Sequence, residues 1–185
     1  MNDAITSLRE ISETPRLELQ VIAAHVLRQS RTWITSHDDI ELNSEQLNEL
    51  NNNLYRLLTK EPLPYIIGEQ EFFGLPFRVN PYVLIPRPET EQLVELTIQW
   101  LMDHPNRRRG IDIGTGSGCI PISLCKIISD LSMIASDVSG SALEVARQNA
   151  QLNEVKNQIT YKLANLYPSD IDKVDFLCAN LPYIP

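Results

Sequence analysis

The stretch "GIDIGTGSG", residues 110–118, decides the fold of this chain, because it holds four of the seven glycines in the sequence. A short apolar run, Gly110–Ile113, is typical of a buried strand, and the loop Gly114–Gly118 follows it directly. Glycine adopts positive φ values and lets a ligand approach the backbone closely. The apolar helix predicted after the loop adds free N–H groups at its N-terminus. The stretch therefore predicts a strand–loop–helix unit that binds a small molecule.

A carboxylate one strand further along supports this interpretation. Asp137 ends the next predicted strand, Ser132–Ser136, 19 residues after Gly118. In nucleotide-binding βαβ units an acidic residue at this place binds the ribose hydroxyls. The loop is GxGxG rather than GxGxxG, which favours a ligand without a pyrophosphate. The alternative without a ligand is a tight strand–helix turn beside a solvated Asp137, and the pairing of loop and acid disfavours it.

The rest of the chain divides into three predicted segments. Residues 1–64 form a helical domain, because their first 60 residues lack glycine and carry apolar residues at helical spacing. Residues 65–87, with Gly68, Gly74 and Pro76, predict a hairpin linker. Residues 88–185 begin with a helix start at Pro88 and then alternate between strands and helices, which predicts a parallel α/β domain.

The helical segment suggests three helices, over Ile5–Ile11, over Leu17–Leu27 and after a cap at Ser44. The inner face of the third would hold Leu47, Leu50, Leu54, Leu57 and Leu58.

Composition and charge predict a soluble globular protein. The net charge of −8 disfavours nonspecific binding to nucleic acid, and the basic cluster Arg107–Arg109 is expected to be a solvated loop. Three cysteines with apolar neighbours and no paired spacing predict buried thiols rather than disulfides or a metal site. Without a long apolar run at the N-terminus, no signal peptide or membrane span is expected, and the cytoplasm is the expected compartment.

With this loop and acid, the sequence resembles the class I S-adenosylmethionine-dependent methyltransferases. In that family the loop passes beneath the methionine part of the cofactor, and the acid holds the ribose. The resemblance implies S-adenosylmethionine as cofactor and an α/β fold, with an N-terminal helical bundle before a partial, Rossmann-like parallel sheet. The implied cofactor-binding residues are Gly114, Thr115, Gly116, Ser117, Gly118 and Asp137.

The motif "NLPY", Asn180–Tyr183, follows an apolar run, Asp175–Ala179, that is predicted to pair with the first strand. Its residues suit methyl transfer to a planar nitrogen, whose delocalised lone pair attacks poorly. The Asn180 side-chain oxygen and the carbonyl of Leu181 can accept hydrogen bonds from that nitrogen and stabilise its growing charge. Pro182 stiffens the loop, and Tyr183 can stack on the planar group. Asn180 and Tyr183 are the candidate catalytic residues, and all four are candidate substrate-binding residues.

The whole ensemble resembles the release factor glutamine N5-methyltransferases, on "IPRPETE" (residues 85–91), "DIGTGSGCI", "SDVSGSALEVARQNA" and "NLPYIP". That family methylates the glutamine of a Gly-Gly-Gln motif in bacterial class-1 peptide chain release factors. The resemblance implies a release factor as partner, no direct nucleic-acid ligand, a monomer if the chain is complete, and closure of the IPRPETE segment over the active site. Leu181 departs from the usual proline, and Asn165 from a common acid, beside the implied adenine contact Leu166. Asn180 is also expected near the cofactor.

Two rivals remain open. Asn-Leu-Pro-Tyr also resembles the motif of adenine-N6 methyltransferases acting on RNA or DNA, although the acidic charge and the IPRPETE segment disfavour that substrate. The family's seven-stranded sheet, of which four strands are counted here in the order three, two, one, four, suggests an inactive or weakly stable C-terminally truncated relative. An oxidoreductase is a distant third, given the loop spacing.

Overall fold

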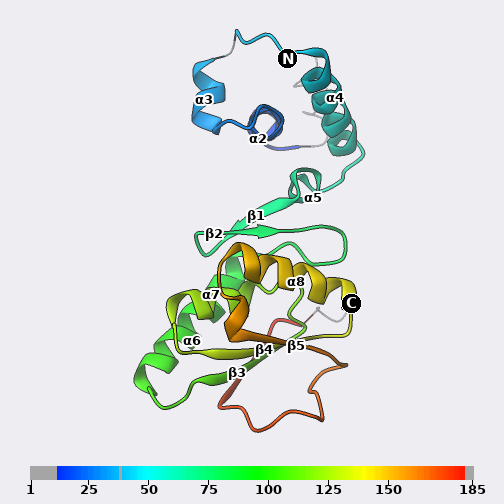
Figure 1. The fold of residues 1–185 in the computed structure, drawn as a ribbon. Helices are drawn as coiled ribbons and strands as arrows, with labels where there is room; N and C mark the ends of the chain where they lie inside the picture. The colour runs from blue at the N-terminus through cyan, green and yellow to red at the C-terminus, as the bar shows by residue number, and fades with distance from the viewer. Residues whose placement is uncertain (1–11, 38, 182–185) are drawn as a thin grey trace. The chain divides into compact units, whose positions relative to one another are not determined.

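The computed structural model describes residues 12–37 and 39–181. The chain divides into two compact units, Met1–Ile67 and Gly68–Pro185. Helices alone make up the described part of the first unit, whereas the second combines helices and strands (Figure 1). Of the predicted hairpin segment, residues 65–67 end a helix of the first unit, and residues 68–87 lie in the second unit.

The described helices of the first unit are α2 (Pro15–Leu27), α3 (Arg31–Ser36), α4 (Ser44–Leu58) and α5 (Leu63–Ile67). Helix α4 begins with a capping box: the Asn43 side chain accepts a hydrogen bond from the Gln46 N–H at 2.9 Å, and the Gln46 side chain accepts one from the Asn43 N–H at 3.1 Å. Ser44, predicted as the cap, is the first helical residue instead, because the Asn43 carboxamide supplies the cap.

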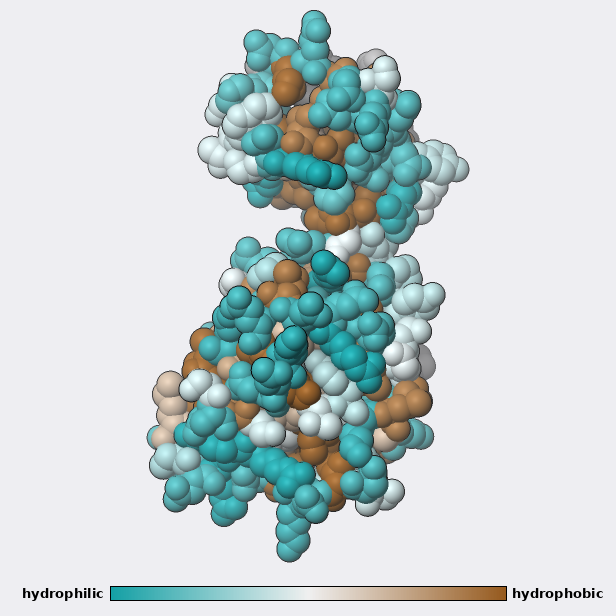
Figure 2. Space-filling model, in the orientation of Figure 1, coloured by the Kyte–Doolittle hydropathy of each residue, from teal (hydrophilic) through white to brown (hydrophobic). Residues whose placement is uncertain are grey.

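The core of the first unit is small and comes from α2, α4 and α5. It contains Leu19, Ile22, Val26, Leu57 and Ile66. The predicted inner face of α4 was wrong for Leu47 and Leu58, which are exposed because this core contacts only a narrow stripe of the helix. Hydrophobic surface is accordingly visible on this unit in Figure 2. The predicted helix Ile5–Ile11 lies outside the described residues.

The second unit opens with an antiparallel hairpin, β1 (Glu69–Phe72) and β2 (Leu75–Arg78). Its two turn residues, Phe73 and Gly74, have φ values of 54° and 69°. A two-residue turn with positive φ at both positions matches the right-handed twist of the strands.

The parallel sheet contains β3 (Arg109–Ile113), β4 (Ser132–Asp137), β5 (Ile159–Leu163) and β6 (Phe176–Ala179). Its order is β5-β4-β3-β6, which confirms the predicted order three, two, one, four. The connecting helices are α6 (Glu91–Asp103), α7 (Cys119–Ile127) and α8 (Gly140–Leu152), with short 3-10 turns at Pro88–Thr90 (η1) and Lys156–Gln158 (η2). Pro88 thus begins a 3-10 turn that leads into α6.

The two faces of the sheet are covered differently. Helices α6, α7 and α8 lie over one face (Figure 1), and their apolar side chains pack with Met133 and Ala135 of β4. The other face carries Ile111, Ile113 and Ile134, against which Ile171 and Val174 of the segment before β6 pack. Strand β4 therefore alternates between two apolar environments, as buried parallel strands do.

Gly110 allows β3 and β6 to pair. It lies opposite Phe176 in the parallel register. A Cβ atom added at Gly110 would collide with the Phe176 ring and come within 2.7 Å of the Met133 sulfur. The absence of a side chain here lets an aromatic ring cross the strand, a role that the strand pattern did not reveal.

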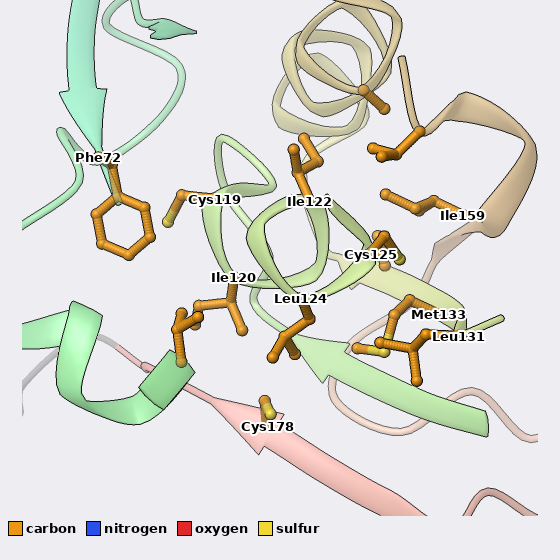
Figure 3. Packing of buried hydrophobic residues seen from close by; sticks show 14 of the residues in the cluster. Phe72, Cys119, Ile120, Ile122, Leu124, Cys125, Leu131, Met133, Ile159 and Cys178 are labelled. Atoms are coloured by element: carbon orange, nitrogen blue, oxygen red, sulfur yellow. The ribbon is translucent and has the colours of Figure 1, made fainter. Parts of the chain in front are cut away.

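The three thiols, Cys119, Cys125 and Cys178, are free and buried in the main core (Figure 3), which confirms the prediction. Burial raises the pKa of Cys119 and Cys125 to about 12 and that of Cys178 to about 11. Within residues 12–37 and 39–181, none of the helices has the length and apolar character needed to traverse a bilayer.

Candidate cofactor and active site

A pocket of about 540 Å³ opens at the carboxyl ends of the parallel strands. All four strands contribute to its wall, with Gly114 after β3, Asp137 ending β4, Ala164 after β5 and Asn180 after β6. The carboxyl edge of a parallel sheet, where the strand order reverses, is the usual ligand site in such folds. The structure thus brings together residues that lie far apart in sequence, such as Gly114 and Asn180, which are separated by 66 positions.

The glycine loop is shaped by three positive φ values, 70° at Gly114, 53° at Gly116 and 79° at Gly118. A Cβ at Gly118 would approach Ile122 at 3.0 Å and Ala146 at 3.1 Å, so this glycine allows α7 and α8 to pack closely. Around Gly116 nothing lies within 4 Å of such an atom, and its backbone lines the pocket. A ligand can therefore lie directly against the loop.

Asp137 joins the loop to the end of β4. Its Oδ2 accepts a hydrogen bond from the Gly116 N–H at 2.9 Å, and its Oδ1 accepts one from the Ser139 N–H at 2.9 Å. Each carboxylate oxygen keeps a second lone pair that can accept a hydrogen bond from a ribose hydroxyl. The predicted ribose acid consequently lies at the pocket and also fixes the loop.

The remaining predicted cofactor residues differ in their exposure. Thr115 and Ser117 are buried and line a small adjoining cavity of about 50 Å³, so their side chains lie outside the main pocket. Leu166 is 57% exposed and lines the main pocket with a positive φ of 64°. The Ser136 hydroxyl donates to the Leu166 carbonyl at 3.2 Å and holds this conformation. An apolar side chain at this place can contact a flat base.

Asn180 lies where the main pocket meets the small cavity. Its Nδ2 donates a hydrogen bond to the Thr90 hydroxyl at 3.0 Å. Leu181 lines the main pocket and approaches Gly114, where a Cβ would meet Leu181 Cδ2 at 3.0 Å. The remaining predicted substrate residues, Pro182 and Tyr183, lie outside the described residues.

Sequence reasoning missed three buried polar residues of this region. Asp112 of β3 is 1% exposed, and neither of its carboxylate oxygens has a hydrogen-bond partner among the described residues. Burial raises the pKa of Asp112 to about 7, and the nearby charge of Asp137 adds to this rise. The Thr115 hydroxyl lies close enough to lower the pKa in part, although it does not form a hydrogen bond with Asp112. In the sequence, a carboxylate between two isoleucines of a predicted strand could have indicated this buried acid. Thr90 lies in the IPRPETE segment, but its contact with Asn180 was not indicated there, and Asn149 carried no signal, since the partners of both are distant in sequence.

The basic cluster is neutralised by neighbouring carboxylates. Ion pairs join Arg107 to Asp175 at 3.1 Å, Arg108 to Asp130 at 3.0 Å and Arg109 to Asp172 at 3.3 Å. Such partly exposed pairs contribute little to stability, but they leave no uncompensated positive patch at this loop.

Comparisons with known proteins agree with the fold and divide the chain as the units do. Residues 1–68 match the family model described as PrmC N-terminal domain, and residues 90–182 match that of ribosomal protein L11 methyltransferase (PrmA). The structure of human methyltransferase 10 domain containing protein is similar, with a TM-score of 0.50 and 26% identity over 76% of this chain and 63% of that chain. The N-terminal domain of human METTL16, in complex with SAH, shares the fold at a TM-score of 0.50 and 19% identity, over 89% of this chain and 66% of that one. Fold and site together define a class I methyltransferase domain.

Proteins with similar sequences identify the family within this class. The release factor glutamine methyltransferase of Aliivibrio fischeri is 35% identical over 95% of this chain and 61% of its own length. That of Flavobacterium psychrophilum is 45% identical over 88% of this chain and 57% of its own length. The chain belongs to the release factor glutamine methyltransferase family, and it spans about three-fifths of the length of these relatives.

Proposed function

We propose that this chain forms the cofactor-binding and catalytic part of an enzyme that methylates the glutamine of the Gly-Gly-Gln motif in peptide chain release factors. The observation that carries the proposal is the meeting of Gly116, Asp137 and Asn180 around one pocket. The names of the relatives that match most of this chain support the choice of glutamine.

S-adenosylmethionine is the proposed cofactor, and it supplies a methyl group on a sulfonium centre. The chain holds it with the backbone of Gly114–Gly118, with the Asp137 carboxylate at the ribose and with Leu166 at the adenine. Thr115 and Ser117 contribute through the backbone of the loop, because their side chains are buried away from the main pocket.

Asn180 acts on the substrate nitrogen. The lone pair of a glutamine amide is delocalised, so the nitrogen needs acceptors for its N–H bonds as positive charge develops. The Asn180 Oδ1 supplies one acceptor and the carbonyl of Leu181 a second, while Pro182 stiffens the turn and Tyr183 stacks on the amide. Holding the nitrogen in line can lower the barrier by several kcal/mol, up to roughly 7–11 kcal/mol in ideal cases. Acceptors aimed at the developing charge add to this effect.

A release factor is favoured over a nucleic acid as substrate. The net charge is −8, and Arg107, Arg108 and Arg109 are each paired with an aspartate. Long-range attraction to a phosphate backbone is therefore weak. We further propose that the enzyme acts as a monomer in the cytoplasm, where release factors meet the ribosome.

The decisive experiment measures cofactor binding and methyl transfer separately. Calorimetric titration with S-adenosylmethionine should show binding, and NADH should bind more weakly or not at all. Mass spectrometry should then detect a methyl group on the Gly-Gly-Gln glutamine of a purified release factor. Methylation of adenine in an RNA oligonucleotide, with the release factor unmodified, would replace the glutamine proposal with its rival. Transfer to neither substrate would reject the proposed activity.

The same assay tests Asn180. Asn180→Ala should greatly reduce turnover and leave the affinity for S-adenosylmethionine nearly unchanged, because its acceptor is most useful as charge develops in the transition state. The exposed Asn157, which lines neither pocket, supplies the control variant Asn157→Ala. Equal turnover in both variants would remove Asn180 from the mechanism.

A further inference from the structure

We propose that Thr90 is a positioning residue for Asn180, and that its hydroxyl holds the carboxamide with Oδ1 available to the substrate nitrogen. This inference rests on the proposed function and gives the threonine of the IPRPETE segment a specific task. Asn180 Nδ2 donates to Thr90 Oγ1 at 3.0 Å, across 90 residues of sequence. Thr90 is 8% exposed, so water competes little for this hydrogen bond.

Thr90 lies directly before α6, but its side chain does not cap the helix, which is the usual role of a threonine at this position. A capping side chain accepts a hydrogen bond from the first turn. Thr90 instead has helical φ and ψ values, −71° and −20°, and its side chain makes no capping bond. The hydroxyl is therefore free to accept the hydrogen bond from Asn180.

The orientation of the carboxamide decides whether Asn180 can assist the reaction. One end of the group accepts hydrogen bonds and the other donates them. A threonine hydroxyl can donate as well as accept, so its presence alone does not select one end of the carboxamide. In this structure the Thr90 hydroxyl accepts from Nδ2, which leaves Oδ1 as an acceptor for the substrate nitrogen. The inverted group would point N–H bonds at the N–H bonds of the substrate amide. A side chain without a hydroxyl would leave Nδ2 unpaired in a half-buried place, which carries a desolvation cost.

The segment that carries Thr90 is fixed at two further points. The Thr90 N–H donates to the Arg87 carbonyl at 3.0 Å within η1. Glu91 Oε1 accepts a hydrogen bond from the Phe73 N–H at 2.8 Å, in the turn of the hairpin. Adjacent residues thus tie the segment to the hairpin and to the end of β6, so the hydroxyl is held in place before substrate arrives.

The first test compares Thr90→Val, which keeps the shape but loses the hydroxyl, with Thr90→Ser, which keeps the hydroxyl. For the valine variant kcat on the release factor should fall about 10–100-fold, the range expected for a misplaced catalytic group, with the affinity for S-adenosylmethionine unchanged. The serine variant should recover most of the rate. Thr160→Val is the matched control, because Thr160 is an exposed residue of β5 that lines neither pocket. Equal kcat values for wild type and Thr90→Val would overturn the proposal.

A double-mutant cycle separates positioning from general packing. In an Asn180→Ala background, Thr90→Val should lower kcat little further, because the group that it positions is gone. An undiminished loss in that background would overturn the proposal.

A readout independent of the substrate keeps this inference distinct from the proposed function. The side-chain amide protons of Asn180, followed by NMR hydrogen exchange, should be protected in wild type and Thr90→Ser and unprotected in Thr90→Val. Equal protection in all three would overturn the contact whatever the substrate is. Protection as expected without glutamine methylation by wild type would support the contact and reject the proposed function instead.

Discussion

The side chain of Asn149 donates a hydrogen bond from Nδ2 to the carbonyl oxygen of Ser117 at 2.9 Å, inside the core. The same nitrogen donates to the Arg78 carbonyl at 3.0 Å, and Oδ1 accepts from the Arg78 N–H at 2.7 Å. One fully buried carboxamide of α8 therefore links the glycine loop to the end of the hairpin. Asn153 adds a second bond to the hairpin, from its Nδ2 to the Pro76 carbonyl at 2.9 Å, but the bond to the glycine loop comes from Asn149.

Replacing Asn149 should affect both stability and cofactor affinity. Asn149→Ala leaves three backbone groups without this partner, and the free energy of unfolding should fall by roughly 2–4 kcal/mol, given about 1–3 kcal/mol for each buried group left unsatisfied and partial access of water. The loop should also bind S-adenosylmethionine less tightly. Urea denaturation and calorimetry measure the two effects. The exposed neighbour Gln148 supplies the control, Gln148→Ala, which should change neither.

Replacement by alanine should affect stability differently at two glycines of the second unit, Gly118 and Gly140. Gly118→Ala adds a Cβ at a φ of 79° and within 3.1 Å of two side chains, so it should cost at least 1 kcal/mol of stability, about the penalty for a left-handed residue. Gly140 begins α8 without positive φ or any atom within 4 Å of an added Cβ. Gly140→Ala should be neutral or stabilise by about 0.5–1 kcal/mol. Equal effects in thermal unfolding would contradict the assigned roles.

The contribution of Asp112 to stability should fall as the pH rises from about 4 to about 7. The buried Asp112 has a folded-state pKa of about 7, above the unfolded value of about 4. Across this window the unfolded chain releases a proton that the folded chain retains, so ionisation favours unfolding. The contribution is complete below pH 4 and is lost by about pH 7.

The variant Asp112→Asn tests this linkage, because its side chain does not titrate. Its free energy of unfolding, relative to wild type, should increase from pH 4 to pH 7. Asp103→Asn, at an exposed carboxylate of α6, serves as control. Parallel pH profiles for wild type and Asp112→Asn would show that Asp112 does not titrate in this range.

Asp137 should affect the ribose contact of the cofactor. Asp137→Asn keeps one oxygen but removes the charge, so binding of S-adenosylmethionine should weaken by roughly 1.5–3 kcal/mol, as for a charge-assisted hydrogen bond. Asp137→Ala should weaken binding further, since the N–H groups of Gly116 and Ser139 then lose their acceptor. Asp130→Asn, at a surface ion pair with Arg108, is the control. Unchanged affinity in Asp137→Asn would place the ribose elsewhere.

Local patterns revealed the strands and the glycine loop, because these depend on apolar runs and on glycines close in sequence. The order of the strands came from the family resemblance. The cap of α4 was displaced by one residue, since Asn43 and Ser44 are both competent caps and the choice depends on the backbone at each. The buried stripe of that helix was overestimated, because periodicity shows an apolar face and not the size of the surface opposite it.

The polar contacts of the site depend on tertiary structure. The resemblance placed the IPRPETE segment over the active site, but no local pattern indicates the bond from Asn180 to Thr90, or the one between Asn149 and Arg78, which lies 71 residues away. Gly110 likewise shows its reason only when the Phe176 ring is in place opposite it. Residue types at the site could thus be proposed from the sequence, whereas their orientation could not.

Because Cys119, Cys125 and Cys178 are buried, their chemical labelling can be used to measure unfolding of the second unit. Alkylating reagents attack thiolates, and the raised pKa values leave almost none at neutral pH. Because β6 carries Cys178 while α7 carries the other two, mass spectrometry of partly labelled chains can distinguish detachment of the edge strand from unfolding of the whole sheet. The native sequence thus allows the order of its unfolding to be followed without an introduced probe.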